Sequence, residues 1–387
     1  MPQISIFRFG RSSAGNIDAE DYTSSITKFK FQELAAATKN FAAELLLDEE
    51  EYGRTFKGCL NLSGQKSSSQ DVAIRQVDED RIYRIYRGHE QTMFSKIRTC
   101  SLLHHPNIVD LIGYSINDKN QMFLVYEFMP LGSLKNHLHD LPRNENPLDW
   151  NTRMKIAAGT AKGLKYLHDR SNPPVVHGNI KPSNILIGEG PEEYWSDDES
   201  KEEAVLAPQG GDTTETDNAG DFLLLKERIP ENDESGYARL FSRQSYRQAP
   251  EFLEYFILTQ QSDIYSFGLV LLELISGRIA EIKPRLVEWA KRKLVYGKEF
   301  TALADPLLNG HYPEQGLYQA FSLAAECLRR EDVSRPRIGY VVTVLSNLAS
   351  ETYDPNAIQI NRAGTLAIGN NEKEKLRELW QHASFDI

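Results

Sequence analysis

The sequence predicts an α+β protein with two lobes, a small β-rich lobe followed by a larger helical one. The chain has 387 residues, of which 40% are hydrophobic, so it can bury more than one sizeable core. Between residues 42 and 127, runs such as DVAIRQV and QMFLVYEF are typical of strands. From residue 130 onward, apolar side chains recur at helical spacing.

The sequence divides into two lobes and two tails, each with its own predicted helices or strands. Residues 1–27 are polar and form a flexible tail, and FKFQELAAATKNF (29–41) forms a short amphipathic helix that docks on the β-type segments after it. The β-rich lobe covers 28–127, with SKIRTCSLLHH as its helix, and a tail with the helix NEKEKLRELWQHA covers 351–387. The helical lobe covers 128–350, with helices in LGSLKNHLHDL, DWNTRMKIAAGTAKGLKYLHDR, SDIYSFGLVLLELISG, LYQAFSLAAECLRRE and GYVVTVLSNLAS.

The negative charge is concentrated in one segment. The formal net charge is −11, and residues 188–220 hold eleven acidic side chains against one base, Lys201, a local balance of −10. Because this stretch is also poor in apolar residues, residues 188–219 are expected to form a disordered acidic insert. The remainder is close to neutral and has no basic stripe, so nucleic acid is not a predicted partner.

Neither export nor membrane insertion is predicted. The chain shows no signal peptide, no apolar span of about 18 residues, and no acylation signal in its N-terminus MPQISIFRFG. Three cysteines, Cys59, Cys100 and Cys327, lack metal-ligand or paired spacing, so they are expected to be free, buried thiols. A cytoplasmic protein without a transmembrane segment is expected.

Several long segments resemble those of eukaryotic protein kinases. FKFQELAAATKNF, SLLHHPNIVDLIGY, LVYEFMPLGSLKNHLHDL, LDWNTRMKIAAGTAKGLKYLH and SDIYSFGLVLLELISGR resemble, in order and spacing, the plant receptor-like cytoplasmic kinases. The resemblance covers roughly residues 29–350. It implies the two-lobed protein kinase fold and a serine/threonine kinase-like role in plant signalling and immunity.

The resemblance assigns two structural roles in the helical lobe. Glu251, in the Ala-Pro-Glu segment, is expected to form a buried ion pair with Arg335. Removal of one partner of such a pair typically costs about 3–5 kcal/mol. Asp263 is expected to hold the catalytic loop. Both roles concern folding rather than catalysis.

The resemblance also implies an adenine pocket. Its hinge follows a tyrosine gatekeeper, and two apolar residues form its roof and floor. The residues at these positions are Ala73, Tyr126, Glu127, Phe128, Met129 and Leu186. Core packing alone explains each of them equally well.

The glycine-rich loop that cradles phosphates in kinases is degraded. The corresponding stretch is LDEEEYGRTFKG, in which Asp48 and Glu50 stand at the first two glycine positions and only Gly53 remains. Gly53, Thr55 and Arg75 are the residues of this region assigned to a vestigial ATP pocket. Like charges a few ångströms apart repel by about 1–4 kcal/mol. Four carboxylates stand where phosphates would lie, namely Asp48, Glu49, Glu50 and Glu51. A solvated hairpin is an equally good interpretation.

The lysine and glutamate pair of the small lobe is also altered. Arg75 replaces the lysine of the Val-Ala-Ile-Lys pattern, and the two side chains are not equivalent at a fitted site. The glutamate that pairs with this lysine aligns with Lys96, so two cations would face each other. An alignment shifted by one helical turn would place a residue other than Lys96 at the position of this glutamate.

The catalytic loop, VVHGNIKPSNILI, has lost its base. In kinases the pattern is His-Arg-Asp-x-Lys-x-x-Asn, and the aspartate accepts the substrate proton. Here His177, Lys181 and Asn184 remain, but Gly178 replaces the arginine and Asn179 the aspartate. An amide accepts no proton at neutral pH, whereas a general base supplies about 10²–10⁴-fold.

The metal-binding aspartate of the Asp-Phe-Gly motif has two interpretations. Asp197 and Asp221 both lie at usual distances from the flanking motifs, and Asp221 is favoured because Phe222 follows it. Asp197 is followed by acids that could not be buried unpaired. With Asn184, Asp221 would form a vestigial metal site.

The sequence therefore predicts a pseudokinase that serves as a scaffold, adaptor or decoy. Its expected partners are receptor kinases, active cytoplasmic kinases or immune receptors, which would place it in the cytoplasm or at the plasma membrane. No cofactor is certain, and ATP and Mg²⁺ are expected to bind weakly if at all. The alternative is an active or weakly active ATP-dependent serine/threonine kinase that uses Lys181, Asn184 and Asp221 in a non-standard arrangement.

Overall fold

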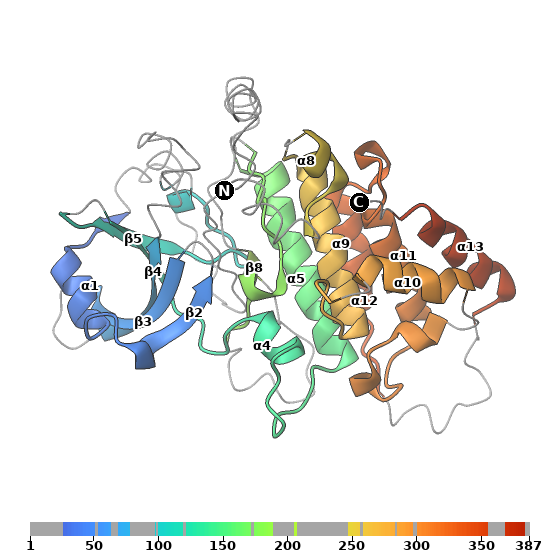
Figure 1. The fold of residues 1–387 in the computed structure, drawn as a ribbon, viewed down its shortest axis with the longest axis horizontal. Helices are drawn as coiled ribbons and strands as arrows, with labels where there is room; N and C mark the ends of the chain where they lie inside the picture. The colour runs from blue at the N-terminus through green and yellow to red at the C-terminus, as the bar shows by residue number, and fades with distance from the viewer. Residues whose placement is uncertain are drawn as a thin grey trace, which may run out of the picture. The chain divides into compact units, whose positions relative to one another are not determined.

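The structure is a computed structural model of the chain. It describes residues 26–50, 53–62, 69–77, 97, 100–118, 121–171, 174–188, 205–206, 247–255, 258–282, 285–296, 300–354 and 368–383. These residues form two compact units, which divide between Gly132 and Ser133 and again between Ile185 and Leu186. The first unit holds a β-sheet and the second is mainly helical (Figure 1), so the predicted two-lobed α+β fold is confirmed.

The first unit is built on a six-stranded sheet with the order β1-β5-β6-β4-β3-β2. The pair β1–β5 is parallel and all other neighbours are antiparallel. Alternate residues of the central strands enter two hydrophobic clusters, one on each face. The strands are β1 (Thr27–Lys28), β2 (Leu46–Glu50), β3 (Gly53–Asn61), β4 (Ser69–Val77), β5 (Leu111–Ile116) and β6 (Met122–Glu127).

The helix predicted at the start of this unit is confirmed, but it is shorter than expected. α1 (Phe31–Ala37) contacts β3 and β5 and ends early because residues 39–41 have positive φ angles of 48°, 58° and 57°. The turn brings the Phe41 ring centroid to 5.1 Å from that of Phe123 and 5.4 Å from that of Phe56. The cluster of Phe41, Phe56 and Phe123 therefore packs the turn after α1 against the sheet.

The second unit is built around α9, which is buried from Ser262 to Ser276 and packs against α5, α10 and α11 (Figure 1). A helix apolar on all sides is stable only when surrounded by protein. A separate two-stranded sheet pairs β7 (Ile185–Leu186) with β8 (Val205–Leu206), of which Leu186 and β8 belong to the first unit. The helices are α4 (Leu134–Leu138), α5 (Trp150–Asp169), α8 (Pro250–Tyr255), α9 (Gln260–Ser276), α10 (Leu286–Tyr296), α11 (Glu314–Cys327), α12 (Ile338–Ser350) and α13 (Asn370–Gln381).

The predicted helices of the second unit are confirmed with small differences at their ends, and α8 and α10 were not predicted. Of the predicted helix SKIRTCSLLHH, only residues 97 and 100–105 are described, and 97 and 100–101 are helical. The N-terminal tail to residue 25 and nearly all of the acidic insert lie outside the described residues.

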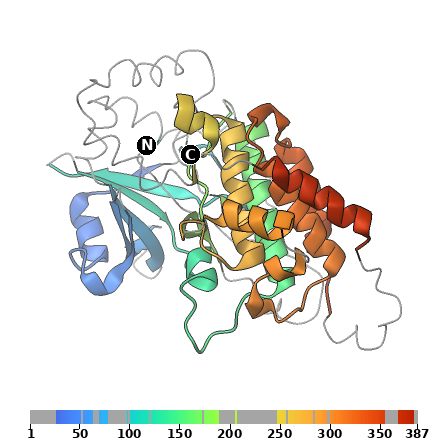
Figure 2. The same ribbon diagram turned by 45° about the vertical axis from the view of Figure 1, so that its right-hand side comes forward.

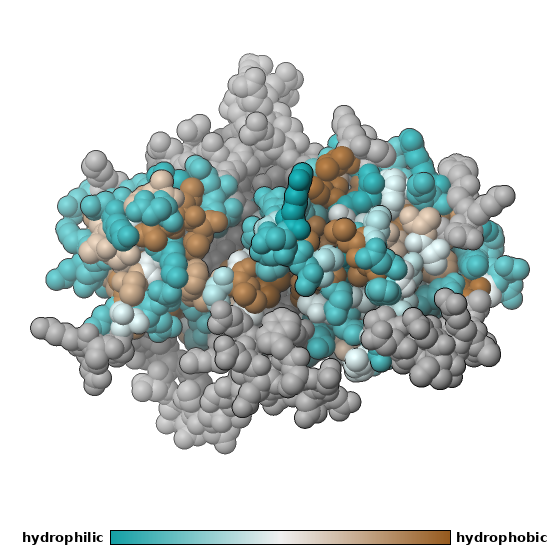
Figure 3. Space-filling view, turned by 90° about the horizontal axis from the view of Figure 1, so that it is seen from below, coloured by the Kyte–Doolittle hydropathy of each residue, from teal (hydrophilic) through white to brown (hydrophobic). Residues whose placement is uncertain are grey.

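The surface of the protein is mostly polar on the face that Figure 3 shows. On the face shown in Figure 3, separate hydrophobic patches lie within a mostly hydrophilic surface. No helix in the described part of the chain has the length and apolar character needed to cross a bilayer.

All three cysteines are free, but Cys59 is exposed rather than buried. The expectation was wrong there because Cys59 alternates with the buried neighbours Gly58 and Leu60 on β3.

Candidate functional site

The predicted catalytic loop is held by Asp263 of α9, as expected. Its Oδ2 accepts a hydrogen bond from the His177 N–H (2.7 Å), and its Oδ1 accepts one from the Gly178 N–H (2.7 Å). Oδ2 also lies 2.9 Å from Nε2 of His168, a contact that the sequence motifs did not indicate. Because the Asp263 side chain is only 1% exposed, these partners replace water around a buried carboxylate.

Asn179, in this loop, is the residue predicted at the position of the catalytic base. Its backbone N–H donates to Nδ1 of His177 (3.2 Å), and its carbonyl oxygen accepts a hydrogen bond from Nδ2 of Asn184 (2.6 Å). Asn179 is 6% exposed and Asn184 is fully buried. The structure thus brings Asn179 and Asn184 together, with Lys181 between them at the start of a 3₁₀ turn. The backbone of Asn179 and the side-chain amide of Asn184 therefore contribute to the shape of the loop.

Gly178 has a φ angle of 76°, in the left-handed region. We expect Gly178→Ala to lower the free energy of unfolding by about 1–2 kcal/mol, because a Cβ disfavours this backbone conformation. Gly339, in α12, is the control: a Cβ there meets nothing within 4 Å, so Gly339→Ala is expected to be stabilising. Urea unfolding of the two variants measures both effects. Equal stability of Gly178→Ala and wild type would contradict the argument.

The stretch aligned with the glycine-rich loop forms the β2–β3 hairpin. Asp48 pairs with Thr55, Glu49 with Arg54, and Glu50 with Gly53 across the two strands. Asp48 and Glu49 are exposed, whereas residues 51–52 lie outside the described range. A Cβ on Gly53 would lie 2.2 Å from the carbonyl oxygen of Gln76, so sheet packing alone requires glycine there.

Arg75 lies in β4 and is 2% exposed. It stands opposite Thr55 on one side and Leu124 on the other. Burial, with a contribution from Cys100, raises the pKa of the Tyr126 phenol well above its usual value, and the charge of Arg75 opposes this shift. The guanidinium therefore lies within electrostatic reach of Tyr126. Lys96 lies outside the described residues.

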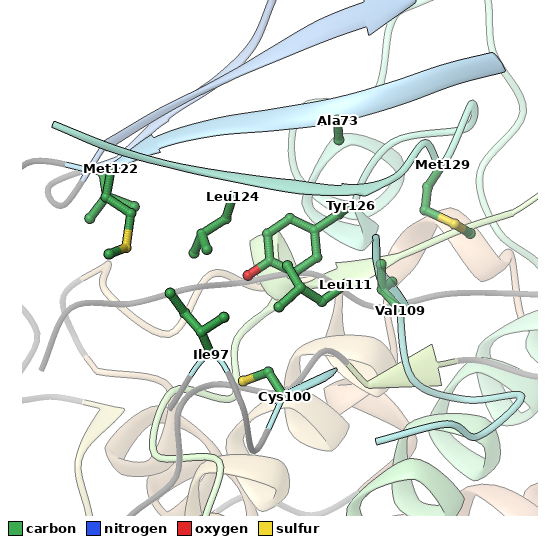
Figure 4. Packing of buried hydrophobic residues seen from close by; sticks show 10 residues of the cluster. Ala73, Ile97, Cys100, Val109, Leu111, Met122, Leu124, Tyr126 and Met129 are labelled. Carbon is green, nitrogen blue, oxygen red and sulfur yellow. The ribbon is translucent and has the colours of Figure 1, made fainter. Parts of the chain in front are cut away.

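The residues aligned with the adenine pocket belong to one hydrophobic cluster. Ala73, Tyr126 and Met129 are buried in it, and Leu186 packs against it. Figure 4 shows the ring of Tyr126 extending from β6 into this cluster. The sheet places Ala73 directly opposite Tyr126, which explains why the two side chains meet.

The hinge residues make contacts of their own. The Glu127 side chain accepts a hydrogen bond from the Asp110 N–H (3.0 Å), and the Glu127 N–H donates to the Asp110 carbonyl oxygen (3.3 Å). Nζ of Lys57 lies 4.4 Å from the ring centroid of Phe128, a cation–π contact. Both contacts hold the chain as it leaves β6.

The two aspartates proposed for metal binding, Asp197 and Asp221, lie outside the described residues. Within the described ranges, no group of three or more His, Cys, Asp or Glu side chains is arranged to hold a metal ion. Asn184 is the only predicted metal ligand that the structure describes, and its Nδ2 donates to the Asn179 carbonyl oxygen.

The predicted ion pair between Glu251 and Arg335 is confirmed. Nη1 of Arg335 lies 2.7 Å from Oε1 of Glu251, and Nη2 lies 2.8 Å from Oε2. Two further buried pairs were missed: Arg247 with Glu273, at 2.6 and 3.0 Å, and Arg153 with Asp305, at 2.7 Å. No local pattern in the sequence indicates them, because each pair joins distant segments.

The ion pair predicts a pH dependence of stability. Burial acts to raise the pKa of the Glu251 carboxyl, but the hydrogen bonds and charge of Arg335 outweigh it and leave the pKa below 4.5. A lowered pKa in the folded state stabilises the protein above the unfolded-state pKa, and this contribution disappears as pH falls through the folded value. The stability difference between wild type and Glu251→Gln is therefore expected to shrink from about pH 6 to about pH 3. Urea unfolding at several pH values measures it, and a constant difference would contradict the assignment.

The comparisons with known proteins agree with this geometry. Residues 42–345 match the family described as protein tyrosine and serine/threonine kinase. From Arabidopsis thaliana, the serine/threonine-protein kinase PBL27 is 44% identical over 367 residues, 92% of this chain and 64% of the relative. The probable serine/threonine-protein kinase PBL7 is 44% identical over 336 residues, 85% of this chain and 79% of the relative. The serine/threonine-protein kinase PBS1 is 43% identical over 335 residues, 85% of this chain and 65% of the relative.

The match covers most of this chain but a smaller part of some relatives. The chain spans 64% of the length of PBL27 and 65% of that of PBS1. The family match nevertheless includes strands β2 to β6 of the first unit and the helices α4 to α11 of the second. The chain therefore belongs to the protein tyrosine and serine/threonine kinase family, and within it to the receptor-like cytoplasmic serine/threonine kinases.

Proposed function

We propose that this protein is a catalytically impaired member of its family, a pseudokinase that acts as a scaffold, adaptor or decoy in receptor or immune signalling. One observation carries the proposal: a buried amide, Asn179, stands at the position of the base in a loop whose other contacts are intact. The loop has kept its shape without the group that accepts the substrate proton. A catalytic defect with a preserved fold is the expected result of that combination.

No residue of the loop 175–187 has a carboxylate that could replace the missing base. An amide side chain accepts no proton at neutral pH, and loss of a general base typically lowers the rate about 10²–10⁴-fold. The carboxylate that holds the loop, Asp263, accepts from two backbone N–H groups and contacts His168, so its oxygens are already engaged. We assign no catalytic step to these residues.

The described residues of the first unit also do not fit Mg²⁺–ATP. Asp48, at a position where the glycine-rich loop carries glycine, and its neighbour Glu49 are exposed carboxylates on β2, and like charges repel anionic phosphates. Arg75 replaces the compact ammonium of a lysine with a planar guanidinium, which is not an equivalent ligand at a fitted site. Both features support the proposal of impaired nucleotide use.

A phosphoryl-transfer assay tests the proposal directly. Purified protein is incubated with γ-labelled ATP, Mg²⁺ or Mn²⁺ and a generic protein substrate, and no transfer is expected. The variant Asn179→Asp is expected to remain inactive as well, because the changes at β2 and Arg75 persist. If wild type transfers phosphate and loses this activity in Lys181→Ala or Asn184→Ala, the chain is an active serine/threonine kinase and the proposal is wrong.

Nucleotide binding is measured separately by thermal shift. A ligand at about 100 times its Kd stabilises a protein by about 2.7 kcal/mol. No shift with Mg²⁺–ATP is expected for wild type, whereas a clear shift would show that nucleotide is a ligand.

The partner class and the cellular location belong to the same proposal. Receptor kinases, active cytoplasmic kinases or immune receptors are the expected partners, and contact with them would place the protein at the plasma membrane or in the cytoplasm. Co-purification from the native tissue, followed by binding of each recovered kinase in purified form, tests this assignment.

A further inference from the structure

The C-terminal segment 368–383 covers a surface of the second unit. In Figures 1 and 2, α13 lies beside α10 and α11, and it contacts both. Leu376 and Trp380 of α13 are fully buried, and Ile368 and Ala383 at its two ends are 4% and 1% exposed. Because Leu376 and Trp380 are four residues apart, their side chains lie on one face of the helix.

The remaining faces of α13 are polar. Glu374 forms an ion pair with Arg377 (3.0 Å), and the Glu372 carboxylate accepts a hydrogen bond from the N–H of Gly369 at the start of the helix (3.1 Å). Lys375 and Glu378 are exposed. The helix therefore carries one narrow apolar stripe, which is the surface that an amphipathic helix presents to a hydrophobic groove.

The surface beneath is made mainly by α10 and α11. Ala383 ties the end of the segment to it, through a backbone bridge to Arg329 and a hydrogen bond from Nζ of Lys291 to the Ala383 carbonyl oxygen (3.3 Å). α10 also contacts α9, so it lies between the central helix and α13. Four apolar residues of α10 are 4% exposed or less, namely Leu286, Val287, Ala290 and Leu294.

The docked state includes two unfavourable polar burials. Nε1 of Trp380 is buried and has no hydrogen-bond partner among the described residues, and an unsatisfied buried donor is destabilising. Glu326 of α11 is half-buried, and burial raises the pKa of its carboxyl against the opposing charges of Arg329 and Lys375. Release of α13 would return the Trp380 N–H to water and would remove the charge of Lys375 from Glu326.

The helix itself adds little stability. α13 has 12 residues, a length at which an isolated helix is marginal in water. Its docking thus depends on a few buried side chains, chiefly Leu376 and Trp380, and is offset by the unpaired N–H of Trp380. A contact balanced in this way can open without unfolding of the rest of the unit.

We propose that α13 is a releasable latch, and that the α10–α11 surface beneath it binds an amphipathic helix of a partner protein with leucine and tryptophan side chains four residues apart. The α10–α11 surface is expected to select such a helix because α13, which covers the surface, has the same leucine and tryptophan spacing. The chain's own segment competes with the partner, since its tether keeps it at high local concentration. The inference rests on the proposed scaffold role and adds a surface to it.

The first test uses a fluorescein-labelled peptide of residues 368–383 as the probe, added to the full-length protein. Full-length Trp380→Ala is expected to bind the peptide at least about tenfold more tightly than wild type, because its own latch docks poorly. Full-length Glu378→Ala, changed on the exposed face of α13, is expected to behave as wild type. A peptide that itself carries Trp380→Ala is expected not to bind. Equal affinity of the probe for all three proteins would overturn the proposal.

The second test needs no variant. Hydrogen exchange of wild type is expected to show α13 amides exchanging at least about 100-fold faster than those of α9, through local opening that is insensitive to low denaturant. Exchange of α13 only together with α9, by global unfolding, would overturn the latch. Neither test involves nucleotide, so an active enzyme with a releasable α13 would refute the proposed function alone.

Discussion

Replacement of Arg335 by methionine is expected to lower the free energy of unfolding by about 3–5 kcal/mol. The Arg335 guanidinium makes two hydrogen bonds to Glu251 and donates to the backbone carbonyl oxygens of Gln261, Arg329 and Arg330. Its side chain is 0% exposed. Methionine fills part of the volume but leaves the Glu251 carboxylate without its counter-ion and three carbonyl groups without donors.

The control is Arg330→Met, in the same loop. Arg330 pairs with Glu254 at 2.9 Å, but its side chain is 47% exposed, and exposed pairs contribute about 0–1 kcal/mol. Urea unfolding of both variants, with the change in midpoint compared at constant m-value, separates the buried pair from the exposed one. Similar losses in the two variants would mean that burial does not determine the strength of the Glu251 pair.

The second large effect is expected for Asp263→Ala, which should lower the free energy of unfolding by about 3–5 kcal/mol. The change leaves the backbone N–H groups of His177 and Gly178 buried without acceptors and removes the contact with His168. Hydrogen exchange of the loop 175–187 is expected to rise more than that of α5. This second readout reports on the loop even when the protein stays folded.

Asp169→Ala is the matched control for this prediction. Asp169 pairs with Lys165 on the surface of α5, and its side chain is 42% exposed, so a loss of less than about 1 kcal/mol is expected. If Asp263→Ala unfolds at the same urea concentration as Asp169→Ala, Asp263 does not hold the catalytic loop.

Much of the candidate site could be predicted from the sequence, because each part lies in a continuous motif. The segment VVHGNIKPSNILI placed Asn179 and Asn184 in one loop, and the structure joins them by a hydrogen bond of 2.6 Å. The Ala-Pro-Glu segment likewise indicated the partner of Arg335. Asp221, Asp197 and Lys96 stay predictions, since they lie outside the described residues.

Local sequence patterns predicted helices less reliably where a backbone turn ends the helix or where the apolar periodicity is weak. The helix expected over residues 29–41 ends at Ala37, because three successive residues turn into the left-handed region and return Phe41 to the sheet. The helix LVEWAKRKLVY was not predicted, although its buried residues recur at helical spacing in α10. Charged residues between them hide that apolar stripe in the sequence.

The order of the lobes could be derived from the residues alone, because hydrophobic period is a local property. The positions of the kinase motifs and the changes within them followed from the resemblance of continuous segments to protein kinases. The packed fold was needed to show which buried charges meet, as in Arg247 with Glu273 and Arg153 with Asp305, and where α13 packs. These contacts join segments far apart along the chain, and their energy depends on burial. Burial is a property of the packed molecule, so no local pattern encodes it.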